Sequence, residues 1–318
     1  MKAFLSEKYG PPETLRLVEL AKPAPNANAV LVQVLAVSVN PADWRSLRAT
    51  PVFARATLGL LRPKYTILGV DIAGQVEAVG SGVTRFTPGD EVYANLLDHG
   101  FGGFAEYVAV PVDVLALKPA NLSFEEAAAV PMAGVTALQG LRHHGDIGAG
   151  QKVLVNGASG GVGHFAVQIA KSYGAEVTGV TSTRNIDRVR SLGADHIIDY
   201  ISEDFTRTGQ AWDRILDTIG NRSVSDLRRA LAPGGTCAVS GFTTMGKLLD
   251  VRLRGGRRIS IVSAHATAKD LELLGEVIEA GKLRPVIDRR YPFIELPEAI
   301  RYLEAGRARG KVVVGDVG

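Results

Sequence analysis

The chain has 318 residues, of which 46% are hydrophobic and 22% charged, with a formal net charge of +3. This length allows one large or two medium domains, and the composition is that of an ordinary globular protein. A small net charge argues against a nucleic-acid partner, and no apolar stretch is long enough to cross a membrane. Cys237 is the only cysteine, so an intramolecular disulfide is excluded. We expect a cytoplasmic protein with no membrane partner.

The first third of the chain is typical of β-structure. Val30–Asn40 is rich in β-branched residues and predicts one long strand. Gly69–Ala94 predicts two short strands separated by glycine and proline turns, and Phe101–Pro119 continues as strand with Pro111 interrupting it. These patterns predict a β-rich domain over residues 1–120, a partly antiparallel barrel or sandwich.

The pattern changes near Asn121. Ser123 and Glu126 have the spacing of a capping box, which predicts a helix start. Strands and helices then alternate, which indicates βαβ units and a parallel sheet. Strands are expected at 153–156, 176–181, 197–199, 214–217 and 236–240, and helices at 164–173, 186–192 and 223–231, the last stopped by Pro233-Gly234-Gly235. A later helix is expected at 270–280 and a helix–strand pair at 296–314. The basic run Arg252–Ser260 is expected to be a solvated loop or a partner-facing surface.

A glycine-rich turn joins the first of these strands to its helix, in the sequence Gly157-Ala158-Ser159-Gly160-Gly161-Val162-Gly163. Glycines here let the backbone approach a pyrophosphate, and the helix start offers free N–H groups. Ala158 departs from the first position of the dinucleotide fingerprint, but the strand before, the helix after and the next strand all fit. The turn therefore predicts dinucleotide binding, with backbone contacts from Ser159, Gly160, Gly161, Val162 and Gly163.

The end of the second strand selects the cofactor. An NAD site needs an acidic residue there, but this chain has Ser182-Thr183-Arg184 and no acid until Asp187. Two hydroxyls and a guanidinium suit the 2′-phosphate of NADPH. The alternative is that Arg184 only begins a solvated helix.

Several motifs in order, GVDIAGQVEAVG, PGDEVYA, VPMAGVTALQGL, NGASGGVG and GKVVVGDV, resemble the medium-chain dehydrogenase/reductase superfamily. Within it, the chain resembles the zinc-free quinone oxidoreductase and alkenal reductase branch, over essentially its whole length. The resemblance implies an α/β protein with a GroES-like β-rich catalytic domain, residues 1–120 and 264–318, and a doubly wound parallel-sheet Rossmann domain, residues 121–263.

The resemblance also bears on metal and chemistry. Asn40, Val70 and Met132 occupy the positions of the zinc ligands in the zinc-dependent members, and none of them is a Cys, His or carboxylate. Without a Lewis acid, an acceptor must already be electrophilic, as quinones and α,β-unsaturated carbonyls are. We therefore expect hydride transfer from NADPH to such a small molecule, with no metal.

Site residues follow from the motif positions. Asn40 and Thr136 are candidate catalytic residues, Asn40 through its amide and Thr136 near the nicotinamide ribose. Trp44, which stands with Arg45 where quinone reductases often carry a tyrosine, is a candidate substrate contact. Further candidates for the substrate are Phe53, Tyr65 and Phe242, and for the cofactor Ser182, Thr183, Arg184, Tyr200, Ser240, Gly241 and Lys311. Several of these are equally compatible with packing or structural roles.

Two alternatives stay open. One is an enoyl-thioester reductase, for which a basic patch at Arg252–Arg258 would bind the carrier's phosphopantetheine. The other is a noncatalytic NADPH-binding redox sensor. The edge of the parallel sheet after Cys237 suggests a homodimer.

Overall fold

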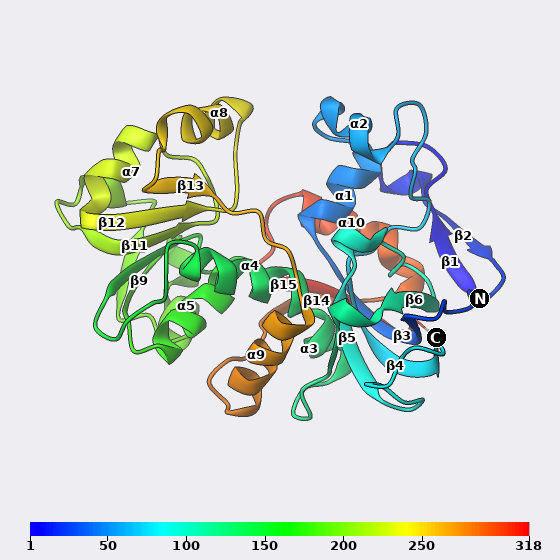
Figure 1. Cartoon of the computed structure of the whole chain (residues 1–318). Coiled ribbons are helices and arrows are strands. Elements are labelled where there is room, and N and C mark those ends of the chain that lie inside the picture. The colour runs from blue at the N-terminus through cyan, green and yellow to red at the C-terminus, as the bar shows by residue number, and fades with distance from the viewer. Residues whose placement is uncertain (318) are drawn as a thin grey trace. The chain divides into compact units, whose positions relative to one another are not determined.

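The structure is a computed structural model that describes residues 1–317. Its contacts divide the chain into two units, which are described separately (Figure 1). The first unit comprises Met1–Met132, Ala266–Glu276 and Pro285–Gly318, and the second Ala133–His265 and Val277–Arg284. Relative to the expected domains, 121–132 pack with the first unit and 277–284 with the second.

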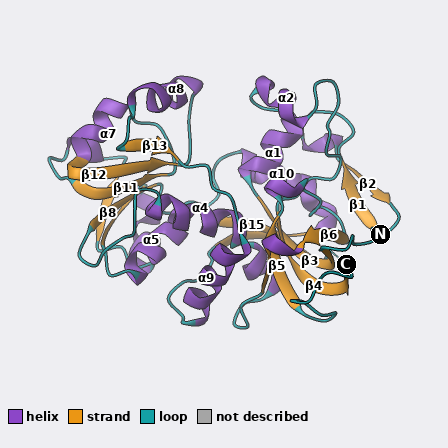
Figure 2. Ribbon diagram, viewed as in Figure 1, coloured by secondary structure: helices purple, strands orange, loops and turns teal. Residues whose placement is uncertain are grey.

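The first unit is built on one large mixed sheet (Figure 2). The strands of this sheet are β3 (Ala29–Val39), β4 (Asp71–Val79), β5 (Glu91–Asn95), β6 (Tyr107–Pro111), β7 (Leu115–Leu117), β14 (Ile287–Pro292) and β15 (Lys311–Gly315). They run in the order β14-β15-β3-β4-β5-β7, and β6 also pairs with β3. β1 (Lys2–Leu5) and β2 (Arg16–Glu19) form a separate antiparallel pair. The long strand β3 is almost entirely buried because neighbours cover it on both sides, as its β-branched sequence predicts.

The helices of the first unit are short. They are α1 (Pro41–Arg48), α2 (Arg55–Leu58), α3 (Phe124–Ala128) and α10 (Leu296–Glu304), together with the 3₁₀ turns Pro12–Thr14, Val52–Ala54, Leu97–His99, Val112–Val114 and Phe293–Glu295. The capping box of α3 is confirmed, since the Glu126 N–H donates to Ser123 Oγ at 3.2 Å and the Ser123 N–H to the Glu126 carboxylate at 3.0 Å. Two helices, α4 (Pro131–Arg142) and α9 (Ala268–Glu279), begin in the first unit and end in the second.

The second unit has a six-stranded sheet in which every pairing is parallel. Its strands are β8 (Lys152–Asn156), β9 (Glu176–Thr181), β10 (His196–Asp199), β11 (Trp212–Asp217), β12 (Leu231–Val239) and β13 (Ile259–Ile261). The order β10-β9-β8-β11-β12-β13 is that of a doubly wound dinucleotide-binding sheet, which confirms the predicted fold class. Its helices are α5 (Gly163–Ser172), α6 (Ile186–Ser191), α7 (Val224–Ala230) and α8 (Met245–Arg254), with 3₁₀ turns at Thr183–Asn185 and Phe205–Arg207.

One local prediction is wrong, and a second is correct only in part, since the arginines of its basic run are exposed as a solvated surface requires. Helix α7 ends at Ala230, because Leu231 is already extended and pairs with Trp212, so Pro233-Gly234-Gly235 lies within β12 instead of stopping the helix. The basic run Arg252–Ser260 is not a simple loop. It starts in the last turn of α8 and ends in β13, where Ile259 is buried in the core.

No helix among residues 1–317 is long and apolar enough to cross a membrane.

Candidate functional site

The turn between β8 and α5 is a backbone cradle. Gly157 has φ +84°, and a Cβ there would lie 2.4 Å from Thr218 Oγ1. A Cβ on Gly163 would lie 2.0 Å from the Gly157 carbonyl oxygen, so the helix start packs too closely on the strand end for any side chain. Gly160, by contrast, has only the Gly157 oxygen nearby, at 3.3 Å. The turn thus leaves the backbone of Ser159–Val162 half-buried and accessible, as binding a phosphate requires.

Side chains fasten this turn to the end of β9. Ser159 Oγ accepts hydrogen bonds from Thr181 Oγ1 at 2.9 Å and from Asn185 Nδ2 at 3.2 Å. Asn185 also donates to Ser182 Oγ at 3.2 Å. Asn185 was not predicted from the sequence as a residue of this site, and it is buried. A polar residue directly after Ser182-Thr183-Arg184 was the only sign of its role that the sequence offered.

The cofactor-selecting segment itself lies at the carboxyl end of β9. Ser182 is buried, whereas Thr183 and Arg184 are exposed. Thr183 Oγ1 donates to the carboxylate of Asp199, at the end of the neighbouring strand β10, and this hydrogen bond lowers the pKa of Asp199. Asp199 was also missed. It is an acid beside the predicted 2′-phosphate position, although not at the strand end where an NAD site carries one.

The cofactor candidates Tyr200, Ser240 and Gly241 follow strands at the same carboxyl edge of the sheet. Tyr200 follows β10 and is 53% exposed, and its N–H donates to the Thr181 carbonyl at 3.0 Å. The Ser240 N–H, after β12, donates to the Asp217 carbonyl at 2.9 Å. A Cβ on Gly241 would lie 2.1 Å from the Thr218 carbonyl oxygen. Phe242 packs partly against the core of this unit.

A buried carboxylate organises the loop after β11. Asp217 Oδ1 accepts from Asn156 Nδ2 at 2.7 Å, from the Ile219 N–H at 3.0 Å and from the Gly220 N–H at 2.9 Å. Burial raises the pKa of Asp217, and these neutral donors oppose the shift. Since Asn156 ends β8, Asp217 ties the β11 loop to the strand that leads into the glycine turn.

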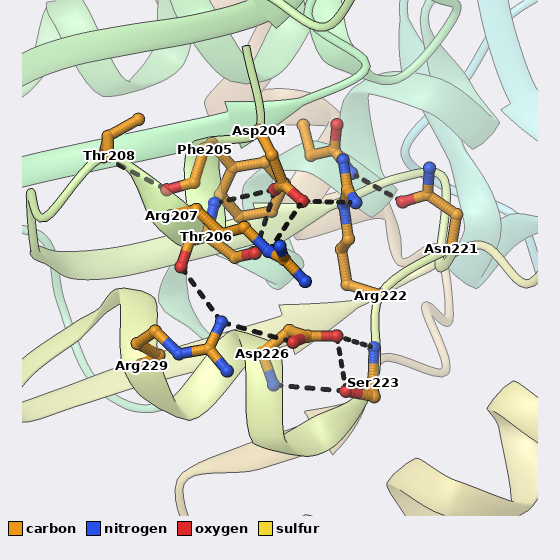
Figure 3. Close-up of polar contacts among 11 residues, drawn as sticks. Asp204, Phe205, Thr206, Arg207, Thr208, Asn221, Arg222, Ser223, Asp226 and Arg229 are labelled. Carbon is orange, nitrogen blue, oxygen red and sulfur yellow. Dashed lines mark hydrogen bonds and ion pairs between the residues drawn. The ribbon is translucent and has the colours of Figure 1, made fainter.

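A second set of polar contacts continues this edge (Figure 3). Arg222 Nη1 lies 2.9 Å from Asp204 Oδ2, and its guanidinium carbon is 5.5 Å from the centre of the Phe205 ring. The Ser223 hydroxyl caps α7, and Arg229 reaches the Thr206 carbonyl at 3.3 Å. The loops after β10 and β11 are therefore held together.

The first unit contains a different polar cluster, centred on Asp71. Asp71 Oδ1 accepts from Asn95 Nδ2 at 2.7 Å and from the Met132 N–H at 3.0 Å. Asp71 Oδ2 accepts from Asn40 Nδ2 at 2.9 Å and lies 3.6 Å from Lys311 Nζ. We call the buried set Asn40, Asp43, Asp71, Asn95 and Lys311 the Asp71 cluster.

The amide oxygen and both amide hydrogens of Asn40 form hydrogen bonds inside this cluster. Its Oδ1 accepts from Lys311 Nζ at 2.5 Å, and its second amide hydrogen goes to the Ser38 carbonyl at 2.9 Å. Asn40 is only 2% exposed. Both amide hydrogens are therefore used, and the prediction that Asn40 offers its amide to an acceptor does not fit. The predicted cofactor contact of Lys311 does not fit either, because its ammonium is buried against Asn40 and Asp71.

Burial shifts the titration of the cluster. It raises the pKa of Asp71, opposed by the Lys311 ammonium, and lowers the pKa of Lys311, opposed by Asp71. Burial raises the pKa of Asp43 to about 8, although the Asn40 N–H donates to its Oδ2 at 2.7 Å. One ammonium thus faces two carboxyl groups, and Asp43 keeps its proton at neutral pH.

The predicted substrate residues of the first unit lie on α1 and on the segment that follows it. Trp44 is half-buried, with the Arg45 guanidinium 5.3 Å from its ring centre. Phe53 is 66% exposed, and the Tyr65 ring packs 5.3 Å from that of Phe101. Thr136, on α4, belongs with Phe242 to the second unit and is half-buried.

A doubly wound sheet with a glycine turn, accompanied by a β-rich unit, defines a dehydrogenase or reductase of the nicotinamide-dependent class. Residues 26–120 match the alcohol dehydrogenase GroES-like domain, and residues 192–314 match the zinc-binding dehydrogenase domain. The chain belongs to the medium-chain dehydrogenase/reductase superfamily, among its quinone and alkenal oxidoreductases.

Individual relatives agree with this assignment. The chain is 37% identical to the 2-methylene-furan-3-one reductase of Solanum lycopersicum, over 100% of this chain and 79% of that protein. It is 36% identical to the chloroplastic NADPH-dependent alkenal/one oxidoreductase of Arabidopsis thaliana, over 99% and 79%. The solved quinone oxidoreductase from Coxiella burnetii is similar with a TM-score of 0.87 and 32% identity, covering 99% of both chains.

The residues at the zinc-ligand positions of the family do not fit a metal. Within residues 1–317, no group of three or more His, Cys, Asp or Glu side chains is placed to hold one. The Asn40 amide oxygen, the atom that a metal would bind, already accepts from the Lys311 ammonium, and Val70 is a buried aliphatic residue without a donor atom for a metal. The Lys311 ammonium already compensates Asp71 and would repel a divalent cation.

Proposed function

We propose that this protein is an NADPH-dependent, metal-independent reductase that transfers hydride to quinones or α,β-unsaturated carbonyl compounds. The observation that carries the proposal is the glycine turn of the second unit, together with the segment Ser182–Arg184 at the end of β9. The Asp71 cluster, in which a lysine ammonium compensates the buried carboxylate, supports the metal-independent part. The relatives that reduce alkenals, enones and quinones support the same substrate class.

The second unit offers the residues to hold the cofactor. The pyrophosphate would bind to the backbone of Ser159–Gly163, where the close packing of Gly157 and Gly163 leaves room for it. Ser182 and Arg184 would bind the 2′-phosphate, and Thr183, whose hydroxyl donates to Asp199, would have to release this carboxylate to join them. The exposed Tyr200 ring would face the adenine. Ser240 and Gly241 would line the same edge. The bound cofactor supplies a hydride from its nicotinamide ring.

A conjugated acceptor suits this arrangement. Hydride addition to a quinone or enone gives a delocalised phenolate or enolate, which needs only hydrogen-bond donors near its oxygen. Thr136 is the proposed hydroxyl donor near the nicotinamide ribose. Trp44, Phe53 and Tyr65 of the first unit are proposed to contact the acceptor, whose apolar rings or chains suit aromatic partners.

The test is an NADPH-oxidation screen of quinones, alkenals and enones, with metal analysis of the same sample. We expect turnover with conjugated acceptors, none with simple ketones, and less than stoichiometric zinc. Stoichiometric zinc with loss of activity on chelation would overturn the metal-independent proposal. Tight NADPH binding without turnover of any acceptor would favour a redox sensor.

The cofactor preference has its own test in Arg184→Ala. Loss of the guanidinium removes a charge-assisted contact to the 2′-phosphate, so the KM for NADPH should rise about tenfold or more while that for NADH changes little. Arg190→Ala is the matched control, because Arg190 is an exposed arginine on α6 that pairs only with Asp187 within its own helix. Equal effects of Arg184→Ala on both cofactors would refute the assignment.

A further inference from the structure

Lys311 is placed beside Asn40 by the pairing of two strands. β15 runs antiparallel to β3 with Val312 opposite Val39, so Lys311 stands next to the residue that begins α1. Its side chain is 4% exposed, and its nitrogen contacts Asn40 Oδ1 at 2.5 Å and Asp71 Oδ2 at 3.6 Å. Burial and these two partners hold the Lys311 ammonium in one position within the first unit.

The ammonium is one of three groups that decide how the Asn40 amide is turned. With Lys311 at Oδ1, the amide nitrogen must face Asp71 and the Ser38 carbonyl, where it finds two acceptors. Without the cation, Oδ1 would be a buried acceptor lacking its partner, and the opposite orientation would place it against two oxygens. Lys311, Asp71 and the Ser38 carbonyl therefore favour the same orientation of Asn40, and loss of the ammonium would leave Oδ1 buried without its donor.

Two helix starts depend on this arrangement. The Asn40 N–H is capped by Asp43, which fixes the first turn of α1, the helix that carries Trp44. The Asp71 carboxylate also accepts from the Met132 N–H in the first turn of α4. The cluster thus connects β15, α1 and α4 through one carboxylate and one ammonium.

We propose that Lys311 is a positioning residue that orients Asn40 and Asp71, and through them the first turns of α1 and α4, and that it makes no contact with the cofactor. The inference rests on the proposed function for its kinetic consequence, which falls on the acceptor and not on NADPH.

The first test measures position without activity. The chain has two tryptophans, so a Trp212→Phe background leaves Trp44 as the only tryptophan and makes its fluorescence a report on α1. We expect Lys311→Met to shift Trp44 emission to longer wavelength and to increase its quenching by acrylamide. Unchanged emission and quenching would overturn the positioning role. This result is independent of whether any acceptor is reduced, so it is distinct from failure of the proposed function.

The matched control is Lys118→Met. Lys118 also belongs to the first unit, its side chain is 4% exposed, and it pairs with Glu91 at 3.0 Å. Loss of this lysine should lower the stability of the unit without changing Trp44 fluorescence. An equal change in Trp44 fluorescence in both variants would show that loss of any buried lysine loosens α1, which would contradict a specific role for Lys311.

The second test separates acceptor from cofactor in the full-length protein. We expect Lys311→Met to lower kcat/KM for an acceptor that the wild type reduces by about tenfold or more, as small displacements in an active site do. The Kd for NADPH, measured without acceptor, should stay within about twofold. A rise in this Kd as large as that in Arg184→Ala would make Lys311 a cofactor residue and refute the proposal.

If Lys311→Met folds poorly, the double variant Asp71→Asn/Lys311→Met removes both charges and avoids an uncompensated carboxylate. It should fold but keep the Trp44 shift, because the Asn40 amide still lacks its cationic partner. Wild-type Trp44 fluorescence in the folded double variant would refute the proposal.

Discussion

Each of the two units buries an aspartate at the end of a strand, but the two carboxylates differ in the kind of group that lies beside them. Asp71 accepts hydrogen bonds at both carboxylate oxygens and has the Lys311 ammonium beside it. Asp217 accepts at Oδ1 only, from neutral N–H groups, and its Oδ2 has no hydrogen-bond partner. Both aspartates are 0% exposed.

The two carboxylates also differ in how far along the chain their hydrogen-bond donors lie. Two of the three donors to Asp217 are backbone N–H groups two and three residues later, in the turn that follows β11. The partners of Asp71 come from the N-cap of α1 and from β5, β15 and α4, which lie far apart in the chain. Asp217 organises a loop, whereas Asp71 joins distant segments through charge.

The largest expected effect is that of Asp71→Asn. An amide cannot accept at both of its termini, so one side would place an NH₂ group against the Asn40 and Lys311 donors. Removing one partner of a buried ion pair costs about 3–5 kcal/mol. Urea denaturation at pH 7 measures the free energy of unfolding, and a loss below about 1 kcal/mol would contradict a charge-compensated cluster.

A second prediction concerns the buried carboxyl group of Asp43. In the folded protein it keeps its proton up to a pKa of about 8, whereas the unfolded chain loses it near pH 4. Stability from this group is therefore present at low pH and is lost as pH rises toward 8, at up to about 1.4 kcal/mol per pH unit.

Asp43→Asn keeps an acceptor for the Asn40 N–H but does not titrate. Relative to this variant, the wild type should lose about 2–3 kcal/mol of unfolding free energy between pH 5 and pH 7. Parallel pH profiles of the two proteins in urea denaturation would show that Asp43 is ionised in the folded state.

The third prediction concerns a substitution, Gly220→Ala, that should distort the loop around Asp217. Gly220 has φ +64°, and a Cβ there would lie 1.8 Å from the Gly241 carbonyl oxygen. Gly220→Ala should cost about 1–3 kcal/mol beyond the backbone strain, because its Cβ would clash with the Gly241 carbonyl oxygen. It should also weaken NADPH binding, because the loops after β11 and β12 move apart. Gly234→Ala is the control, with a similar φ of +79° but open space around the glycine. Equal losses in both variants would leave strain alone as the cause.

The smallest effect is expected for Asp217→Asn. The amide keeps Oδ1 for the Asn156, Ile219 and Gly220 donors, and its NH₂ group replaces an oxygen that accepts no hydrogen bond. Loss of the buried charge offsets the weaker hydrogen bonds, so the change should stay within about 1 kcal/mol at pH 7. A loss as large as that of Asp71→Asn would abolish the contrast between the two aspartates.

The sequence was informative where a residue's role depends on its neighbours in the chain. The glycine turn between β8 and α5 and the capping box at Ser123 follow from conformational and hydrogen-bonding rules that act over a few residues. The boundary of α7 was not predictable in this way. Leu231 leaves the helix because it pairs with Trp212 on β11, and this pairing outweighs its high helix propensity.

The sequence by itself determined the parallel sheet and the glycine turn between β8 and α5, because both follow from patterns that are local in the chain. It placed Asn40 and Lys311 in the site but assigned their contacts to acceptor and cofactor. Only the tertiary structure decided that they bind each other across 271 positions, because the register of β15 on β3 brings them together. Burial then makes the ammonium and the Asp71 carboxylate depend on one another, since neither charge has water to solvate it.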